Sequence, residues 1–497
     1  MSSQQKNPAN RYVSDLKRYG VGQSQFPSVL RSLVPIALSG IFLLLIAIFV
    51  AWSQDSFGQE WLIVAVAAVV GGYMALNIGA NDVANNMGPA VGGKVLTVLA
   101  AVLIAAVCES AGAILAGGDV VKTVSKGIIS PGTSIDVSQF RDLMLSALFA
   151  AALWINLATM LSAPVSTTHS IVGGVLGGGI AASGFGLINW VTMSQIAASW
   201  VISPVFGAAC AAAILFFIKK RILNVEDRLE AARFWVPVLI AVMASAFTAY
   251  MAMKGLKKIW GPSLVEIVIY SGAAFLIAYL ASRPVVAART TRLQNRKKDI
   301  YGLFDAPLIA GAALLSFAHG ANDVANAVGP LAAIVSTVQD QSGIASVVSI
   351  PLWVMVVGAV GISFGLGLFG PKLIRVVGQK ITRLNSPRAF SVALSAAITV
   401  LIATSFGLPV SSTHIAVGAV FGVGFLREFL ENPNKRTLRP GHKLNETAED
   451  AFNSISFRSV RRLVRRRFAL SIAAAWFITV PASALLAAVL YWLLRLL

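Results

Sequence analysis

The chain has 497 residues, of which 57% are hydrophobic and only 12% are charged. So little charge cannot cover the surface of a soluble protein of this length. Many apolar runs also reach the roughly 20 residues that cross a bilayer as a helix. The composition therefore excludes a soluble globular protein and predicts an all-α polytopic membrane protein in contact with the lipid bilayer.

The net charge of +19 comes from 40 Lys and Arg residues against 21 Asp and Glu residues. In a soluble protein this excess would suggest nucleic-acid binding. Here the basic residues cluster in loops beside apolar segments, as in the cytoplasmic loops of membrane proteins. We therefore expect no nucleic-acid partner, a multi-pass protein of the plasma membrane (the inner membrane of a bacterium), and a cytoplasmic N-terminus.

Thirteen apolar segments follow a polar N-terminal tail, so we expect about 12–13 membrane segments. Two of them, 166–186 and 409–426, are short and rich in Gly, Ser and Thr, which predicts broken helices or re-entrant hairpins. The predicted segments are 31–52, 61–80, 94–117, 141–163, 166–186, 192–218, 234–253, 264–282, 304–321, 350–370, 388–408, 409–426 and 468–494.

The predicted organisation has two repeats and five further parts. In chain order, the seven parts are a cytoplasmic tail (1–30), an extra helix with its loop (31–60), a first repeat (61–220), connecting helices with a basic cytoplasmic loop (221–303), a second repeat (304–426), a charged cytoplasmic loop (427–467) and a C-terminal helix (468–497).

The loop charges predict the direction of the repeats. With the N-terminus inside, the basic stretches 219–221, 283–298, 372–388 and 427–467 all fall inside, while Lys254, Lys257 and Lys258 fall on the wrong side. The first repeat then starts from the outside and the second from the inside. We therefore expect inverted-topology repeats, which place a site near the midplane and allow alternating access to it.

Two polar motifs occur twice within these apolar stretches. Gly-Ala-Asn-Asp-Val-Ala-Asn stands at 79–85 and again at 320–326, and Pro-Val-Ser-(Thr/Ser)-Thr-His stands at 164–169 and again at 409–414. Residues 79–89 match 320–330 at nine of eleven positions. Duplicated polar motifs at membrane depth predict a transporter whose two repeats surround one central site.

The Asn-Asp motifs offer oxygen ligands, which we expect at a helix break. Carboxylate and amide oxygens suit a hard cation such as Na⁺, and a buried carboxylate can alternatively carry a proton. Helix capping is the structural alternative, which the duplication disfavours. The candidate residues for cation binding or coupling are Asn81, Asp82, Asn85, Asn322, Asp323 and Asn326.

The Pro-Val-Ser motifs predict two helix N-termini, because Pro fits the first turn and Ser or Thr caps it. Hydroxyls and free N–H groups at two facing termini would bind a tetrahedral oxyanion without a fixed positive charge. Close packing of small residues is the alternative. The candidate residues for anion binding are Ser166, Thr167, Thr168, Ser411, Ser412 and Thr413.

Four further side chains interrupt apolar surroundings. His169 and His414 could contact the anion, relay protons or bond across helices. Glu109 is a candidate cation ligand or proton carrier, unless a neighbouring hydroxyl simply satisfies it. His319 precedes the second Asn-Asp motif where the first copy has Ile78, so we expect a local packing or proton role and not a shared ligand.

The sequence carries no signature of an enzyme or of a bound cofactor. Cys108 and Cys210 lie in apolar segments without metal-ligand spacing. We find neither a nucleophile–base arrangement nor a Gly-rich Lys motif for nucleotides. We therefore expect a non-enzymatic protein whose only cofactor-like partner is a coupling ion, Na⁺ or H⁺, with no other metal.

At these motifs the chain resembles the inorganic phosphate transporter (PiT) family, over roughly 60–220 and 300–425. The resemblance implies an inverted-repeat fold and phosphate import by symport with Na⁺ or H⁺. It implies phosphate binding at the six hydroxyl residues and cation binding at the six Asn-Asp residues. Glu109 matches a family acidic position 27 residues after Asp82.

Two features depart from the family pattern. Animal members carry a Glu 16 residues before the second Pro-Val-Ser proline, where this chain has Ala393, and segment 31–52 is extra to the repeated core. The first departure weakens the case for Na⁺ and leaves H⁺ open. A sulfate permease of the same fold and a passive anion channel stay as alternative functions, and a homodimer stays open.

Overall fold

A computed structural model of the chain describes residues 28–130, 134–161, 165–255, 261–339, 350–374, 384–431 and 466–496. Within these ranges it consists of helices and their connections, with no β-strand. The long helices are α2 (Ser28–Trp52), α3 (Trp61–Gly92), α4 (Val98–Ala116), α6 (Val137–Met160), α7 (Thr167–Ser183), α8 (Trp190–Ile218), α9 (Arg228–Tyr250), α10 (Leu264–Thr290), α12 (Asp305–Gln339), α13 (Leu352–Leu368), α15 (Ser386–Ser405), α16 (Ser412–Glu431) and α18 (Arg466–Leu496).

The described helices confirm an all-α membrane protein. Eleven of them are long and apolar enough to cross a bilayer. The shorter α7 and α13, of 17 residues each, bring the long helices among the described residues to the thirteen expected. Most of the predicted tail and of the loop 427–467 lies outside the described residues.

One expectation about these helices was wrong. We expected segments ending near 80 and 321 and a helix break at each Asn-Asp motif. Instead, α3 and α12 run on without interruption through Pro89 and Pro330 respectively. The physical reason is that polar side chains at membrane depth need partners and not a break, and here other helices supply those partners.

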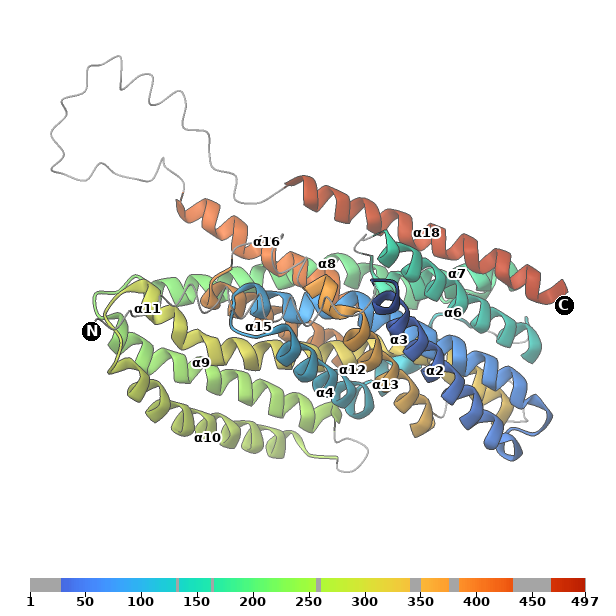
Figure 1. The fold of residues 1–497 in the computed structure, drawn as a ribbon, viewed down its shortest axis with the longest axis horizontal. Helices are drawn as coiled ribbons and strands as arrows, with labels where there is room; N and C mark the ends of the chain where they lie inside the picture. Colours follow the sequence, from blue (N-terminus) through green and yellow to red (C-terminus); the bar gives the residue numbers. More distant parts are fainter. Residues whose placement is uncertain are drawn as a thin grey trace, which may run out of the picture.

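The breaks occur instead at the Pro-Val-Ser motifs. There α6 and α7 form one helical hairpin, and α15 and α16 form a second one. Figure 1 shows the first hairpin toward the right-hand end of the molecule and the second toward the left-hand end. The tips meet between these ends, so the two hairpins enter from opposite sides.

The remaining helices follow the same inverted pattern. In Figure 1, α3 begins after the turn from α2 at the right-hand end, whereas α12 begins beside α11 (Lys297–Tyr301) at the left-hand end. Each motif helix packs against a helix of the other repeat, α3 on α13 and α12 on α4. This crossed packing confirms the inverted-topology repeats.

Glycines bring the crossed helices into backbone contact. A Cβ at Gly79 would overlap the carbonyl of Ile362 on α13, and a Cβ at Gly320 would overlap the carbonyl of Glu109 on α4. Ser110 and Ser363, the residues that follow these two carbonyls, share a hydrogen bond of 2.7 Å between their hydroxyl oxygens. Equivalent positions of the two repeats therefore meet each other.

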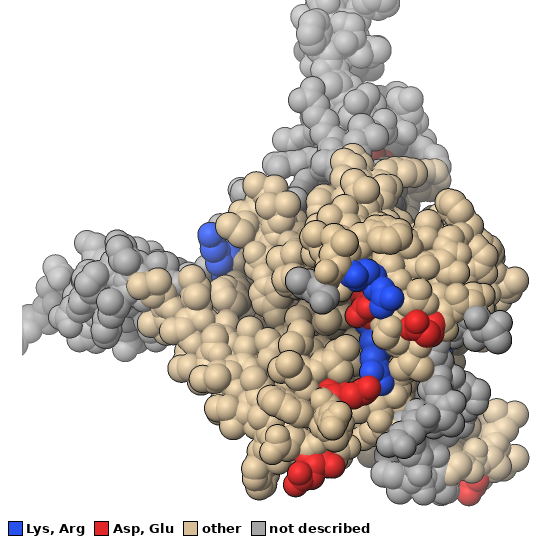
Figure 2. All heavy atoms as spheres, turned by 90° about the vertical axis from the view of Figure 1, so that its right-hand side faces the viewer, with Lys and Arg blue, Asp and Glu red and all other residues tan. Residues whose placement is uncertain are grey.

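The outer surface is apolar, as a lipid-facing surface requires. None of the residues in the most apolar stretch of α10 is buried, although the helix packs along α9. At the right-hand end, Figure 2 shows a largely uncharged face with Lys or Arg side chains lying beside Asp or Glu side chains. Ion pairs between described residues include that of Arg495 with Asp142, at 3.2 Å.

Candidate functional site

The two hairpins present capped helix N-termini to each other. The Ser166 Oγ accepts a hydrogen bond from the backbone N–H of His169 at 3.1 Å, and the Ser411 Oγ accepts one from His414 at 3.3 Å. Both serines are buried. These bonds use the two hydroxyls as N-caps, so the side chains that follow them carry the contacts within the site.

Asn81 and Asn322 anchor the motif helices to the hairpin tips. The Asn81 Nδ2 donates to the carbonyl oxygen of Val165 at 3.1 Å, and the Asn322 Nδ2 donates to that of Leu408 at 3.0 Å. The Asn322 Oδ1 also accepts from the backbone N–H of Val410 at 3.1 Å. Both amides therefore satisfy non-helical backbone that would otherwise be unpaired at this depth.

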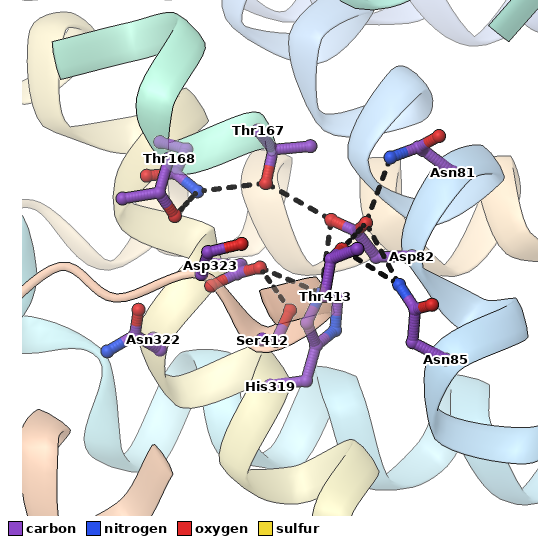
Figure 3. Close-up of polar contacts among 12 residues, drawn as sticks. Asn81, Asp82, Asn85, Thr167, Thr168, His319, Asn322, Asp323, Ser412 and Thr413 are labelled. Carbon is purple, nitrogen blue, oxygen red and sulfur yellow. Dashed lines mark hydrogen bonds and ion pairs between the residues drawn. The ribbon is translucent and has the colours of Figure 1, made fainter. Parts of the chain in front are cut away.

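The Asp82 carboxylate is held by hydroxyls from both hairpins (Figure 3). Its Oδ2 accepts from the Thr167 hydroxyl at 3.1 Å, and its Oδ1 accepts from the Thr413 hydroxyl at 3.0 Å. Asn81 and Asn85 donate to Oδ1 at 3.0 and 3.5 Å. Asp82 is fully buried, so the structure places an acidic group where both tips can reach it.

Asp323 repeats this arrangement with fewer partners. Its Oδ2 accepts from the Ser412 hydroxyl at 3.0 Å, whereas its Oδ1 has no hydrogen-bond partner. Asn326 donates to the hydroxyls of Thr167 and Thr168, at 3.3 and 3.2 Å, and its own Oδ1 has no partner. Two buried oxygens one helical turn apart thus stay unpaired in the second repeat.

His319 joins the carboxylates of both repeats, which the sequence did not predict. Its Nε2 lies 3.0 Å from Asp323 Oδ2 and 3.6 Å from Asp82 Oδ2, and its Nδ1 lies 3.2 Å from Glu109 Oε2. The expected proton or packing role of His319 stays a prediction, and the structure adds that this side chain lies between the carboxylates of both Asn-Asp motifs. No local sequence signal indicates this contact, because it depends on the packing of α12 against α4.

The partners of Glu109 among the described residues are an amide and an imidazole, and not the hydroxyl that was the structural alternative. Its Oε1 accepts a hydrogen bond of 2.9 Å from the Asn86 Nδ2, while its Oε2 faces His319. The equivalent residues at the crossing of α3 and α13 are Ile78 and Ile362, since Gly79 approaches the Ile362 carbonyl as Gly320 approaches that of Glu109. The Glu–His pair is therefore a difference between otherwise matching halves.

The site can take up positive charge. Asp82, Glu109 and Asp323 are three buried carboxylates, and His319 is the only basic side chain that the described residues bring within ion-pair distance of them. Buried carboxylates require a compensating cation or a proton. The unpaired oxygens of Asp323 and Asn326 are hard ligands of the kind that Na⁺ accepts, so the residues fit this ion.

The two motif histidines lie together behind the hairpin tips. The rings of His169 and His414 have centroids 4.6 Å apart, and the His169 Nδ1 lies 2.7 Å from the Ser166 Oγ. Both imidazoles are buried. The structure thus brings together every site residue that the sequence singled out, in two layers.

Ala393 lies well away from these carboxylates. It is fully buried beside Gly311 on α12, where an added Cβ would lie 3.6 Å from that of Ala393. Gly311 precedes Asp323 by twelve residues, which is about 18 Å along a helix. The departure from the animal family pattern therefore leaves the Asn-Asp cluster itself unchanged.

Inverted repeats, two re-entrant helix N-termini and buried carboxylates between them define the class. The chain is an integral membrane transport protein, and side chains from both of its halves meet in one buried polar cluster.

Comparison with known proteins gives the family. Residues 78–487 match the model of the phosphate transporter family, and the chain belongs to that family. A Helicobacter pylori protein named provisionally as a phosphate permease is 46% identical over 485 residues, covering 88% of this chain and 91% of the relative. A Thermococcus kodakarensis protein with the same provisional name is 35% identical over 448 residues, covering 88% and 98%.

A solved structure is similar throughout the shared core. It is described as "The sodium-dependent phosphate transporter" and is 33% identical, with a TM-score of 0.77. The match covers 88% of this chain and 100% of that chain. Together with the family match, this confirms the resemblance that the four motifs indicated.

Proposed function

We propose that the protein imports inorganic phosphate by secondary active symport with Na⁺, through alternating access to the site between the hairpin tips. The observation that carries this proposal is the sharing of hydroxyls. Thr167, Ser412 and Thr413 stand at two helix N-termini suited to an oxyanion, yet they donate to the buried carboxylates of Asp82 and Asp323.

This sharing links the two ligands. A phosphate anion beside two bare carboxylates would meet strong like-charge repulsion in a poorly hydrated site. Na⁺ bound by the carboxylates removes that repulsion and releases the hydroxyls to donate to phosphate. Each ligand therefore raises the affinity for the other, and this reciprocal coupling is the thermodynamic basis of symport. The similarity to a transporter described as sodium-dependent supports Na⁺ as the ion.

The test is uptake of labelled phosphate into liposomes that contain the purified full-length chain. An inward Na⁺ gradient, at equal pH on both sides, should drive phosphate above its equilibrium level. Flux that neither saturates nor accumulates would instead indicate a passive anion channel. Stronger competition by sulfate than by unlabelled phosphate would indicate a sulfate permease.

One observation favours proton coupling as the second candidate. The His319 imidazole lies between carboxylates and can itself carry the compensating charge. In that case an inward proton gradient in Na⁺-free buffer would drive accumulation, and a Na⁺ gradient alone would not.

A further inference from the structure

Trp200, on α8, contacts both hairpins where their tips meet. Its indole Nε1–H donates to the carbonyl oxygen of Pro409, at the tip of the second hairpin, at 3.2 Å. Its ring lies against the imidazole of His169, in the first turn of α7, with centroids 3.8 Å apart. One side chain thus joins two helix N-termini that come from opposite ends of the molecule.

The contact continues from Trp200 into the cap of the first hairpin. His169 places its Nδ1 2.7 Å from the Ser166 Oγ, the same oxygen that caps α7. The same imidazole lies 4.6 Å, between ring centroids, from that of His414 in the first turn of α16. The indole therefore supports the layer of side chains directly behind both N-termini.

Trp200 stands on a helix that is packed tightly against the second hairpin. Added Cβ atoms at Gly418 and Gly422 of α16 would overlap the backbone of Pro204 and Ala208 on α8. Trp200 lies one turn before Pro204, so its position is fixed relative to α16. Its contact with His169 then sets where the first hairpin stands relative to the second.

The sequence around Trp200 is itself duplicated. Ile-Ala-Ala-Ser-Trp at 196–200 recurs as Ile-Ala-Ala-Ala-Trp at 472–476. The second copy lies on α18, which packs on α7 as α8 packs on α16. The tryptophan therefore belongs to the repeated unit and not to a local feature of α8.

We propose that Trp200 is a positioning residue of the oxyanion site, which holds the two hairpin tips at the spacing that lets both face one anion. This inference rests on the proposed function, because it assigns Trp200 a part in phosphate binding. The spacing matters because a helix N-terminus acts only over its first turn, and hydrogen bonds weaken steeply with distance and angle.

The test distinguishes the contribution of the indole N–H hydrogen bond from that of the ring's contact with His169. W200F removes the hydrogen bond to Pro409 and keeps an aromatic ring against His169, whereas W200L removes both contacts. The matched control is W190F, because the Trp190 Nε1–H also donates to a backbone carbonyl, that of Phe185 at 3.1 Å, but at the start of α8. All variants are assayed for phosphate uptake in liposomes.

We expect W200F to raise the half-saturating phosphate concentration about fivefold, the effect of one net hydrogen bond. W200L should raise it further, while the maximal rate is retained in W200F and W190F matches the wild type. A W200F variant with wild-type phosphate affinity, or with a lower maximal rate alone, would overturn the proposal.

A second readout does not depend on phosphate. Hydrogen exchange of the backbone amides at 165–170 and 410–414 reports directly on the tips. Faster exchange in W200F than in W190F is expected, and equal exchange would overturn the positioning role. If the wild type takes up no phosphate, the proposed function fails, while this measurement still decides whether Trp200 positions the tips.

Discussion

Replacing Glu109 and His319 with isoleucine would give the crossing of α12 and α4 the residue type that stands at the equivalent positions, Ile78 and Ile362, of the crossing of α3 and α13. Each single replacement leaves a buried polar partner behind. E109I removes the carboxylate that lies 3.2 Å from the His319 Nδ1, and H319I removes the imidazole that faces the Glu109 Oε2. Losing one partner of a buried pair costs about 3–5 kcal/mol.

The double variant should cost less than the sum of the two single variants. Replacing both members of a buried pair by apolar residues is often close to neutral. We therefore expect a coupling energy of at least about 2 kcal/mol, within the range known for residues in contact. H319I keeps a cost of its own, because Asp323 then retains only the Ser412 hydroxyl.

The assay is equilibrium unfolding of the four proteins in mixed detergent micelles. A second cycle, between Glu109 and Asp142, is the control, because Asp142 pairs with Arg495 and not with the site. That cycle should be additive within about 0.5 kcal/mol. Additive costs for Glu109 and His319 would refute the assignment of a coupled buried pair.

Three further predictions concern packing, the anion site and a helix cap. G177A should destabilise the protein by at least about 1–3 kcal/mol, because the added Cβ would overlap the α18 backbone, whereas G186A, which has open space, should be neutral in the same unfolding assay. S412A should raise the half-saturating phosphate concentration at least about tenfold, since the hydroxyl serves a charged group, and S405A, an exposed control, should not. D136A should cost about 1 kcal/mol through loss of the α6 cap. The pKa of Asp136 is lowered, mainly by a backbone N–H in the first turn of α6 and then by a serine hydroxyl, so the cap persists at neutral pH and is lost only below about pH 4. Wild-type stability in D136A, or unchanged phosphate affinity in S412A, would contradict these assignments.

The sequence predicted the repeats because their polar motifs are duplicated in apolar surroundings. The direction of the repeats followed from the basic loops. The sequence also predicted the hairpins, since Pro and Ser begin helices and the two segments rich in Gly, Ser and Thr are short. The prediction of a helix break at Asp82 and Asp323 was wrong, because the hydroxyls that bind these carboxylates come from residues more than eighty positions away.

Contacts across the repeats could not be predicted from a single sequence. The meeting of His319 with Glu109 depends on α12 packing against α4, which no local pattern encodes. The role of Trp200 was missed for the same reason, although the second copy of its motif was visible in the sequence.

The central claim is that Asp82 and Asp323 couple phosphate movement to a cation. The most direct measurement is the steady-state ratio of internal to external phosphate in liposomes under an imposed cation gradient, for the wild type, D82N, D323N and the control D142N. We predict accumulation above equilibrium for the wild type and D142N, and no accumulation for D82N or D323N. Accumulation to the wild-type ratio by D82N or D323N would contradict the claim.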